Sequence, residues 1–265
     1  MTPPIIGAIA RPQLPPERIA TVARAADSAG LDELWLWEDC FWEGGISMAG
    51  AVLGMTERLT VGIGLLPMPL RNVALAAMEI AALDRLFPGR FVVAVGHGVQ
   101  DWMAQAGARV ESPLTLAREY VGALRRLLAG ETVTVSGRYV ELHEVQLVWP
   151  PATPTPLHMG ATGPNSLRLS GEIADGTILA GETDLPGFVR ARELVLDGWG
   201  ARPGRPEFTA FVPCELGAIG ADALIEPWAA AGADRVVFGP GPDEPDPEAF
   251  VTTIAAVSGR VRHRP

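Results

Sequence analysis

Three short stretches of the sequence carry the residue types that acid–base chemistry requires. "WLWEDCFW" places Glu38 and Asp39 side by side, "AVGHGVQDW" places His97 between two glycines, and "LAGETD" contains Glu182. Carboxyl and imidazole groups are the usual general acids and bases of enzymes, because burial and neighbouring charges bring their pKa values close to neutral. We therefore expect these ionisable side chains at any catalytic site of this chain.

A fourth stretch, "LHMGATGPNSLRLSGEIADG", passes from an apolar run through a glycine turn into a predicted helix. Pro164 stands at the expected first helical position, and Gly163 is a candidate for a positive φ. The first N–H groups of a helix have no partner within it, and the helix dipole favours negative charge there. Gly160 to Ser166 therefore predict either an anion site or an ordinary helix start.

The composition excludes several kinds of chemistry. All 21 basic residues are arginine, so no lysine is present for a Schiff base or a P-loop. The four histidines lack metal-motif spacing, and two cysteines, Cys40 and Cys214, are too few for a zinc site, so we expect no metal. The net charge of −10 argues against a nucleic-acid partner. Because no membrane-span or signal-peptide pattern is present, we expect a cytoplasmic protein without a membrane partner.

Short apolar runs alternate with helical patterns along the chain. Runs rich in valine, isoleucine and leucine, without polar alternation, predict strands buried on both faces. The predicted strands are Ile5–Ala10, Glu33–Glu38, Leu59–Leu66, Phe91–Gly96, Pro156–Gly160, Thr177–Gly181, Thr209–Glu215 and Arg235–Phe238. The predicted helices include Glu17–Ala29, Val73–Leu86, Leu116–Ala129, Asn165–Ala174, Phe188–Trp199, Ala221–Ala231 and Pro247–Val257.

This alternation predicts an α/β fold, a (β/α)8 TIM barrel in a single domain over residues 1–265. A doubly wound open sheet is the alternative, but "IGAIARPQLPP" at the first strand lacks the glycine fingerprint of that fold. "TVTVSGRYVELHEVQLV", residues 132–148, predicts a β-hairpin that turns at Ser136-Gly137. The hairpin would be an excursion between the fourth helix and the fifth strand.

In such a barrel the functional site lies at the C-terminal ends of the strands. Glycine recurs at these ends, at Gly64, Gly96, Gly98, Gly160, Gly163, Gly181 and Gly239. Positions without side chains allow a large flat group to approach the backbone closely. The alternative is that these glycines only terminate strands.

The stretches "GRFVVAVGHGVQDWMAQAG", the hairpin, "WPPATPTPLHMGATGPNSLRLSGEIADGTILAG" and "GADRVVFGPGPDEPDPEAF" follow one another in this order. Together they resemble the luciferase-like flavin-dependent monooxygenase and reductase superfamily, and most closely its branch that depends on the deazaflavin coenzyme F420. The resemblance covers nearly the whole chain. The fold of that family is the (β/α)8 barrel, which agrees with the fold predicted from the alternation of strands and helices.

The resemblance implies coenzyme F420 as cofactor, with FMN as the alternative, and a small-molecule substrate. In the F420 branch a hydride moves between the deazaflavin C5 and a small organic substrate, while the protein supplies orientation and proton management. The family seats its ring against a bulge at the end of the third strand, where we expect a cis peptide bond between Gly64 and Leu65. The implied cofactor-binding residues are Asp39, Gly64, Leu65, Gly96, His97, Gly98, Gly160, Ala161, Thr162, Gly163, Asn165 and Ser166.

The resemblance also suggests roles for the ionisable and aromatic residues. Asp39, His97 and Glu182 are the candidate catalytic residues. The family often has an acid followed by histidine at the end of the second strand, whereas here Cys40 follows Asp39. The candidate substrate pocket is formed by Glu38, Trp42, Met68 and Trp102. The resemblance further admits a homodimer.

Three other functions remain open. An FMN-dependent monooxygenase would use the same barrel and the same phosphate site. A non-catalytic flavin-binding protein would need no acid–base pair, and the sequence contains no unmistakable one. A glycosidase would use two carboxyl groups a few ångströms apart, drawn from Glu38, Glu182 and Glu215 at three strand ends.

Overall fold

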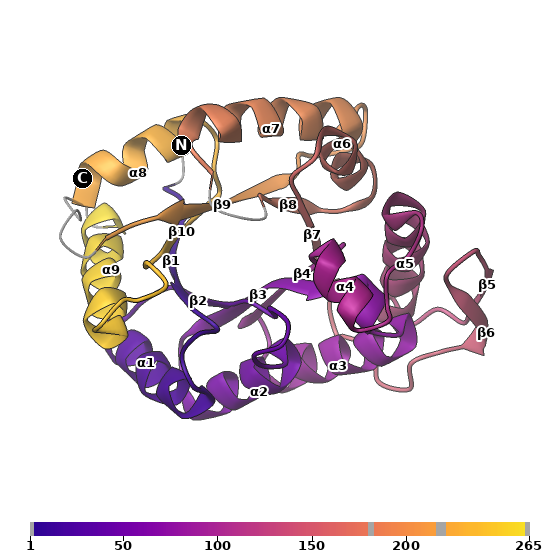
Figure 1. Ribbon diagram of the computed structural model, residues 1–265, viewed down its shortest axis with the longest axis horizontal. Helices are drawn as coiled ribbons and strands as arrows, with labels where there is room; N and C mark the ends of the chain where they lie inside the picture. The colour runs from indigo at the N-terminus through magenta and orange to yellow at the C-terminus, as the bar shows by residue number, and fades with distance from the viewer. Residues whose placement is uncertain (1–2, 180–182, 216–220, 263–265) are drawn as a thin grey trace.

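A computed structural model shows a closed barrel of parallel strands inside a ring of helices (Figure 1). The structure describes residues 3–179, 183–215 and 221–262. The strands follow one another around the barrel in the order β1-β10-β9-β8-β7-β4-β3-β2, with every neighbouring pair parallel. The predicted (β/α)8 barrel is therefore confirmed, and the open-sheet alternative is wrong because β1 pairs with both β2 and β10.

Each predicted barrel strand is present, with bounds that differ by a few residues. The barrel strands are β1 (Ile5–Ala10), β2 (Glu33–Leu36), β3 (Thr60–Pro67), β4 (Phe91–Gly96), β7 (Leu157–Ala161), β8 (Gly176–Leu179), β9 (Glu207–Pro213) and β10 (Arg235–Gly239). Almost all of their residues are buried, since side chains on one face fill the barrel and those on the other contact the helices.

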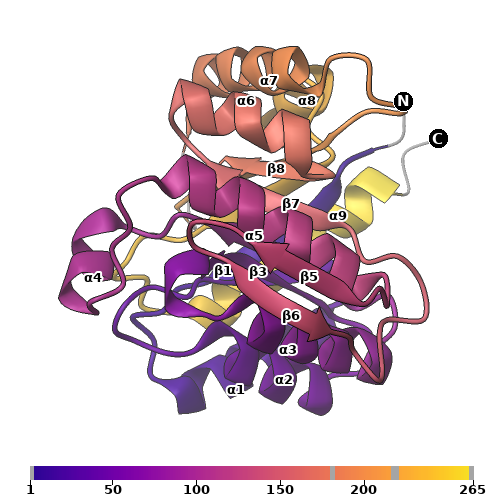
Figure 2. The same ribbon diagram turned by 90° about the vertical axis from the view of Figure 1, so that its right-hand side faces the viewer.

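The helices of the outer ring each follow a strand (Figure 1). They are α1 (Pro16–Ala29), α2 (Gly45–Met55), α3 (Val73–Leu86), α5 (Pro113–Leu128), α6 (Pro164–Ile173), α7 (Leu185–Trp199), α8 (Ala221–Ala230) and α9 (Pro247–Arg262). Two short helices, η1 (Met68–Leu70) and α4 (Gln100–Gln105), come directly after β3 and β4. Figure 2 shows α4 projecting from one end of the barrel, where it borders the cavity described below.

The predicted hairpin lies outside the barrel. It consists of β5 (Val133–Ser136) and β6 (Glu141–Val145), which pair antiparallel and lie against α5 (Figure 2). Its turn is closed by the Gly137 N–H, which donates to the Val140 carbonyl at 2.9 Å. Glu119 on α5 accepts hydrogen bonds from three consecutive backbone N–H groups of this turn, at residues 138–140. The hairpin is thus fixed to the outer ring and does not contribute to the barrel sheet.

The barrel interior is filled by large side chains opposite glycines. A cluster of Ile9, Trp35, Ala94, Ile178, Phe211 and Val237 occupies the middle of the barrel. Trp35 is fully buried, and a Cβ on Gly62 would lie 2.4 Å from its indole ring. A Cβ on Gly64 would similarly lie 2.8 Å from the Cζ atom of Phe211. The glycines of β3 therefore make room for the aromatic floor of the barrel.

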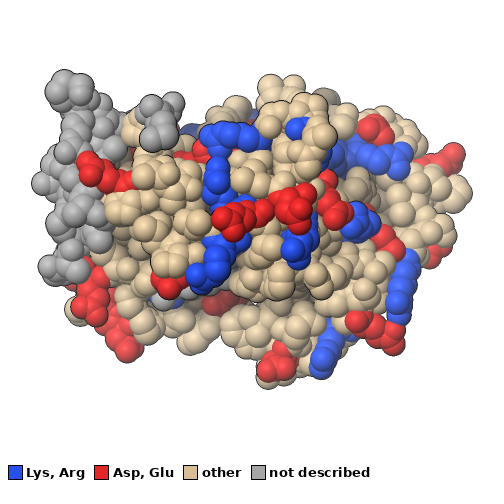
Figure 3. All heavy atoms as spheres, turned by 90° about the horizontal axis from the view of Figure 1, so that it is seen from above, with Lys and Arg blue, Asp and Glu red and all other residues tan. Residues whose placement is uncertain are grey.

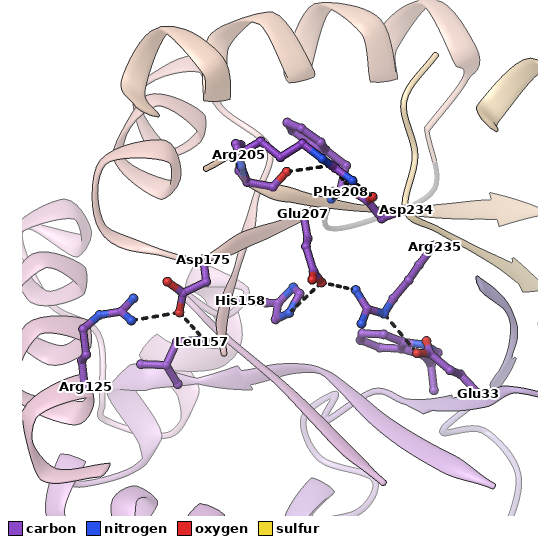
Figure 4. A network of polar contacts seen from close by, with 12 residues as sticks. Glu33, Arg125, Leu157, His158, Asp175, Arg205, Glu207, Phe208, Asp234 and Arg235 are labelled. Carbon is purple, nitrogen blue, oxygen red and sulfur yellow. Dashed lines mark hydrogen bonds and ion pairs between the residues drawn. The ribbon is translucent and has the colours of Figure 1, made fainter. Parts of the chain in front are cut away.

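A network of charged side chains lies at the N-terminal ends of the strands (Figure 4). Arg235 donates to Glu33 at 3.0 Å and also forms an ion pair with Glu207. Glu33 in turn accepts a hydrogen bond from the Trp35 indole at 2.8 Å. His158 lies 3.7 Å from Glu207 and is 2% exposed, so burial lowers its pKa to about 4. This end of the barrel is closed by paired charges and has the character of a structural layer.

Acidic and arginine side chains are interleaved on the face over helices α6 to α8 (Figure 3). Several of them form ion pairs, such as Arg168 with Asp197 at 2.8 Å and Arg118 with Glu172 at 2.6 Å. None of the helices in residues 3–179, 183–215 and 221–262 combines the length and the apolar character that a membrane span requires.

Candidate active site

A cavity of about 460 Å³ opens at the C-terminal ends of the barrel strands. Pockets for small molecules and cofactors span about 300–1,000 Å³, so this one suits a ligand of that kind. It is lined by Trp37, Glu38, Asp39, Gly64, Leu65, Pro67, His97, Gly98, Val99, Trp102, Gly160, Ala161, Thr162 and Phe211. Most of these residues come from the exits of β2, β3, β4 and β7, as the barrel fold predicts.

The exit of β2 contributes two carboxylates with different surroundings. Glu38 forms a bidentate ion pair with Arg71, in which Nη1 and Oε1 are 2.6 Å apart, and it also accepts the Gly45 N–H at 2.6 Å. Within the described residues, the Asp39 carboxylate has no hydrogen bond or ion pair. Burial raises the pKa of Asp39, and the nearby charge of Arg11 opposes this shift. Asp39 is thus the acid that remains available to a ligand in the cavity.

Trp37 lines the cavity, and Arg11 lies against it. The Arg11 guanidinium lies 4.7 Å from the centre of the Trp37 ring, and its Nε donates to the Pro240 carbonyl at 2.8 Å. Trp37 also packs against Phe211, with ring centres 5.7 Å apart. This wall of the cavity is therefore aromatic, and the charge of Arg11 behind it also acts on Asp39.

His97 connects the exit of β4 to the start of α6. Its Nε2 lies 3.0 Å from the hydroxyl oxygen of Ser166, while its Nδ1 is buried and has no hydrogen-bond partner among the described residues. Buried N–H donors without an acceptor are rare, so we assign the proton to Nε2. Burial lowers the pKa of His97 and keeps the imidazole neutral. In this tautomer Ser166 accepts from His97, and its own hydroxyl proton is free to donate to a ligand.

The end of β3 contains the predicted irregularity. The peptide bond between Gly64 and Leu65 is cis, which confirms that prediction, and the pairing of β3 with β4 shifts register between Ile63 and Leu66. Leu65 lines the cavity, and a Cβ on Gly96 would lie 2.4 Å from its Cδ2 atom. Gly96 therefore supports the position of Leu65 from β4. A second cis bond, between Cys40 and Phe41, was not predicted.

The glycine turn leads into α6 as predicted, with Pro164 as the first helical residue. Gly163 is the N-cap and has no side chain to cap the helix, so the N–H groups of Asn165 and Ser166 have no side-chain acceptor. The expectation of a positive φ at Gly163 is wrong, because its φ is −77° and its ψ is 153°. The residue has an extended conformation that any amino acid can adopt. Gly98 does have a positive φ, of 66°.

The loop between β2 and α2 contains two further ionisable groups. Burial raises the pKa of Glu43 to about 7, and its Oε1 is buried without a hydrogen-bond partner in the described part of the chain. Burial also raises the pKa of the Cys40 thiol, and the neighbouring charges of Glu38 and Asp39 raise it further. Glu43 does not line the cavity and was not among the predicted residues.

The structure places the predicted substrate-pocket residues in different surroundings. Glu38 and Trp102 line the cavity. Met68 does not, because η1 turns its side chain into the core, where it is 2% exposed. Trp42 is 59% exposed and is not among the residues that line the cavity, and its backbone N–H donates to the Asp39 carbonyl. Glu182 lies outside the described residues.

The predicted cofactor residues also separate into two groups. Asp39, His97 and Gly98 meet in one cavity with Gly64 and Leu65 of β3 and with Gly160, Ala161 and Thr162 at the end of β7. Asn165 lies instead beside an outer concavity of about 360 Å³ between α5 and α6. Within the described residues, no group of three or more His, Cys, Asp or Glu side chains converges as metal ligands would.

Sequence reasoning missed Arg11, Trp37 and Phe211. Trp37 directly precedes the acidic pair but was placed inside a strand, and Phe211 lies within β9 and not at its end. Alternation along β9 is the signal that could have shown that Phe211 points into the barrel, because side chains of a strand alternate between its two faces. No local pattern signals Arg71, which reaches Glu38 from 33 residues away.

A closed (β/α)8 barrel with a cavity at its C-terminal end, lined by an acid that has no partner among the described residues, and with an uncapped helix start nearby, is typical of barrel proteins that bind small molecules. The model of the luciferase-like monooxygenase family matches residues 2–233. The chain therefore belongs to the luciferase-like monooxygenase family.

Curated relatives include two kinds of enzyme. The chain is 32% identical over 169 residues to a 5,10-methylenetetrahydromethanopterin reductase of Methanolobus tindarius, covering 63% of this chain and 51% of that protein. It is 32% identical over 193 residues to an F420-dependent glucose-6-phosphate dehydrogenase of Nakamurella multipartita, covering 67% and 57%. The matches thus span a little over half the length of these relatives.

Solved structures share the fold over almost the whole chain. The coenzyme F420-dependent tetrahydromethanopterin reductase of Methanopyrus kandleri superposes with a TM-score of 0.81 at 19% identity, covering 96% of this chain and 98% of that one. An F420-dependent secondary alcohol dehydrogenase bound to an F420-acetone adduct gives a TM-score of 0.78 at 20% identity, covering 97% and 99%. At these identities the likeness concerns the fold.

Proposed function

We propose that this protein is a coenzyme F420-dependent oxidoreductase that acts on a small organic substrate. The observation that carries the proposal is the cavity itself, which has an apolar wall at the β3 bulge and is also lined by Gly160–Thr162, the residues that lead into the uncapped start of α6. A flat ring with a phosphate-bearing side chain requires an apolar surface for the ring and hydrogen-bond donors for the phosphate. Relatives that depend on F420 support the choice of this cofactor over others.

The residues of the cavity fit such a cofactor. Leu65, Val99 and Phe211 offer apolar contacts for a ring, and the backbone at Gly98 leaves it space. Just beyond the lining residues Gly160–Thr162, the N–H groups of Asn165 and Ser166 and the hydroxyl of Ser166, which contacts the cavity residue His97, can donate to a phosphate. Because the chain has no lysine, backbone amides and hydroxyls are well suited to this task. When bound, F420 supplies or accepts a hydride at C5 of its deazaflavin ring.

Asp39 is the residue that we assign to proton management. Its carboxylate faces the cavity, has no partner in the described residues, and has a raised pKa because it is buried. Such a carboxyl group can accept the hydroxyl proton of a substrate that loses hydride, or return it in the reverse direction. His97 is neutral and bonded to Ser166, so it suits an orienting role better than proton donation.

Fluorescence titration of the purified protein with F420 and with FMN tests the proposed cofactor. We expect F420 to bind at least tenfold more tightly, a difference of about 1.4 kcal/mol. Asp39→Asn should retain this binding within about threefold but lose turnover with candidate alcohol or imine substrates. Tighter binding of FMN would favour an FMN-dependent monooxygenase, and binding of neither flavin would refute the proposal.

We also propose a homodimer formed through helices α2 and α3, which are neighbours in the ring (Figure 1). On α3, Leu75 and Met78 are 47% and 59% exposed. The adjacent helix α2 has no charged residue, and its exposed positions are the small residues Ser47, Ala51 and Gly54. The large apolar side chains of α3 can pack against the small residues of α2 in a second copy, and a twofold axis repeats this contact.

Sedimentation velocity tests the dimer. We expect the wild-type chain to sediment as a dimer and Met78→Glu to sediment as a monomer, because a buried unpaired charge is costly. Val189→Glu is the matched control on α7, where Val189 is 39% exposed outside the proposed surface. A monomeric wild type, or a Met78→Glu dimer, would contradict this interface.

A further inference from the structure

Arg71 links three elements behind the cavity wall. It follows η1, and its guanidinium holds Glu38 at the exit of β2, with Nη1–Oε1 and Nη2–Oε2 distances of 2.6 and 3.2 Å. Its Nε donates to Glu79 on α3 at 2.9 Å. The side chains of Arg71 and Glu38 are only 15% and 8% exposed. This is a partly desolvated ion pair with defined geometry, and removal of one partner would leave a charge without compensation.

Both carboxylate oxygens of Glu38 are occupied. Oε1 accepts from Arg71, and Oε2 accepts from Arg71 and from the backbone N–H of Gly45 at 2.6 Å. Gly45 is the first residue of α2, so the helix dipole adds to the stabilisation of the negative charge. A Cβ on Gly45 would lie 3.2 Å from Oε2, which shows how closely Glu38 packs there. Glu38 is therefore held against the wall although it borders the cavity.

Asp39 is the adjacent residue and differs in each of these respects. In the described residues its carboxylate has no hydrogen bond, and the charge that acts on it most is that of Arg11. Two carboxylates that are neighbours in sequence would repel each other if neither were neutralised. The ion pair with Arg71 places a positive charge 2.6 Å from Glu38 Oε1, which opposes the effect of the Glu38 charge on its neighbour.

We propose that Arg71 is a positioning residue that neutralises Glu38, so that Asp39 alone serves as the acid of the cavity. The inference rests on the proposed function only in giving Asp39 its role toward a ligand. The charge arrangement itself is independent of any cofactor. The charge of Arg11, after β1, acts on Asp39, and the thiol of Cys40 is coupled to both Glu38 and Asp39. Arg71 after η1, Glu79 on α3 and Tyr120 on α5 interact on the side of Glu38. His97 after β4 lines the same cavity, and Glu43 lies on the same β2–α2 loop.

The thiol of Cys40 provides a reporter of this charge arrangement. It follows Asp39 directly, is half-buried, and responds to the charges of both Glu38 and Asp39. In a Cys214→Ser background Cys40 is the only thiol. The rate of its alkylation by iodoacetamide across pH then measures its apparent pKa without any flavin.

We expect Arg71→Met to raise the apparent pKa of Cys40 by about one unit or more, because Glu38 is then an uncompensated negative charge. The double variant Arg71→Met/Glu38→Gln should return the value close to that of the parent. Glu38→Gln alone should lower it, which keeps the test valid if Arg71→Met fails to fold. A thiol that titrates identically in the parent, Arg71→Met and Glu38→Gln proteins would overturn the proposal.

Arg71→Lys distinguishes charge from geometry. A lysine restores the positive charge without the bidentate contact, so the Cys40 pKa should return most of the way to the parent value. Retained thermal stability with a shifted thiol pKa in Arg71→Met would support an electrostatic role. Lost stability with an unshifted thiol pKa would make Arg71 merely structural. Flavin titrations are scored separately, so a failure of the proposed cofactor leaves the thiol result interpretable.

Discussion

Replacement of Gly163 by valine tests whether the start of α6 binds the phosphate of a cofactor. The backbone at Gly163 is extended, with φ −77° and ψ 153°, a region that β-branched residues favour. No atom lies within 4 Å of a Cβ placed on this residue, so the new side chain would enter open space. The cost to the fold is the loss of a favourable N-cap residue, at most about 1 kcal/mol.

The effect on binding should be larger than the effect on folding. A phosphate that accepts from the N–H groups of Asn165 and Ser166 must lie just ahead of the helix, where the valine methyl groups would project. We expect at least a tenfold loss of F420 affinity, about 1.4 kcal/mol. Fluorescence titration measures the affinity, and thermal unfolding of the same protein measures the cost to the fold.

Gly163→Ala is the matched control. Alanine also replaces the glycine N-cap, but it has no side-chain acceptor for the N–H groups of Asn165 and Ser166 and no β-branch, so this variant should bind within about threefold of wild type. Inorganic phosphate should weaken F420 binding to the wild-type and Gly163→Ala proteins by competition. If Gly163→Val binds the flavin as tightly as wild type and phosphate does not compete, the cofactor phosphate does not lie at α6.

Three further outcomes follow from the geometry. The pKa of Glu43 in the folded protein is about 7, against an ordinary value of 4.5, so the folded state loses stability as pH rises through 7 and the buried carboxyl group ionises. Glu43→Gln should therefore raise the melting temperature at about pH 8 and not at about pH 4. The pKa of His158 is lowered from 6.5 to about 4, so on acidification the unfolded chain takes up the proton first, and the stability of the folded state falls as pH drops below 6.5. In His158→Gln the melting temperature should depend less steeply on pH between about 6.5 and about 4. Gly96→Ala places a Cβ 2.4 Å from Leu65 Cδ2, so Leu65 should shift into the cavity and weaken flavin binding about threefold or more, while unfolding changes by about 1–3 kcal/mol. Unchanged titrations in that variant would remove Leu65 from the binding surface.

The barrel could be predicted because buried parallel strands form continuous apolar runs. Each predicted run coincides with a barrel strand, and Val73–Leu86 is correct at both ends. Two helices, α2 and α4, were not predicted. The sequence of α2, "GISMAGAVLGM", has no polar face and therefore no helical period, and α4 has only six residues. A helix without charged residues escapes a search for amphipathic patterns.

The site was predictable as far as it depends on strand ends. Asp39, His97 and the turn at Gly160 follow strands directly, and the fold brings those ends together. Contacts that depend on loop geometry could not be predicted. Met68 is an example, because a single 3₁₀ turn after β3 decides whether its side chain enters the cavity or the core.

The carboxylates at the two ends of the barrel differ in whether they are paired with arginine, and this difference supports the position of the candidate site. At the N-terminal end, Arg235 neutralises both Glu33 and Glu207. At the C-terminal end Arg71 neutralises Glu38, yet Asp39 remains without a partner among the described residues. Asp39 is partly buried and lines the cavity, and a carboxylate with a raised pKa in a cleft is a candidate for contact with a ligand. Among the described residues, no arginine pairs with Asp39 as Arg71 does with Glu38. This difference supports the proposal that Asp39 meets a ligand.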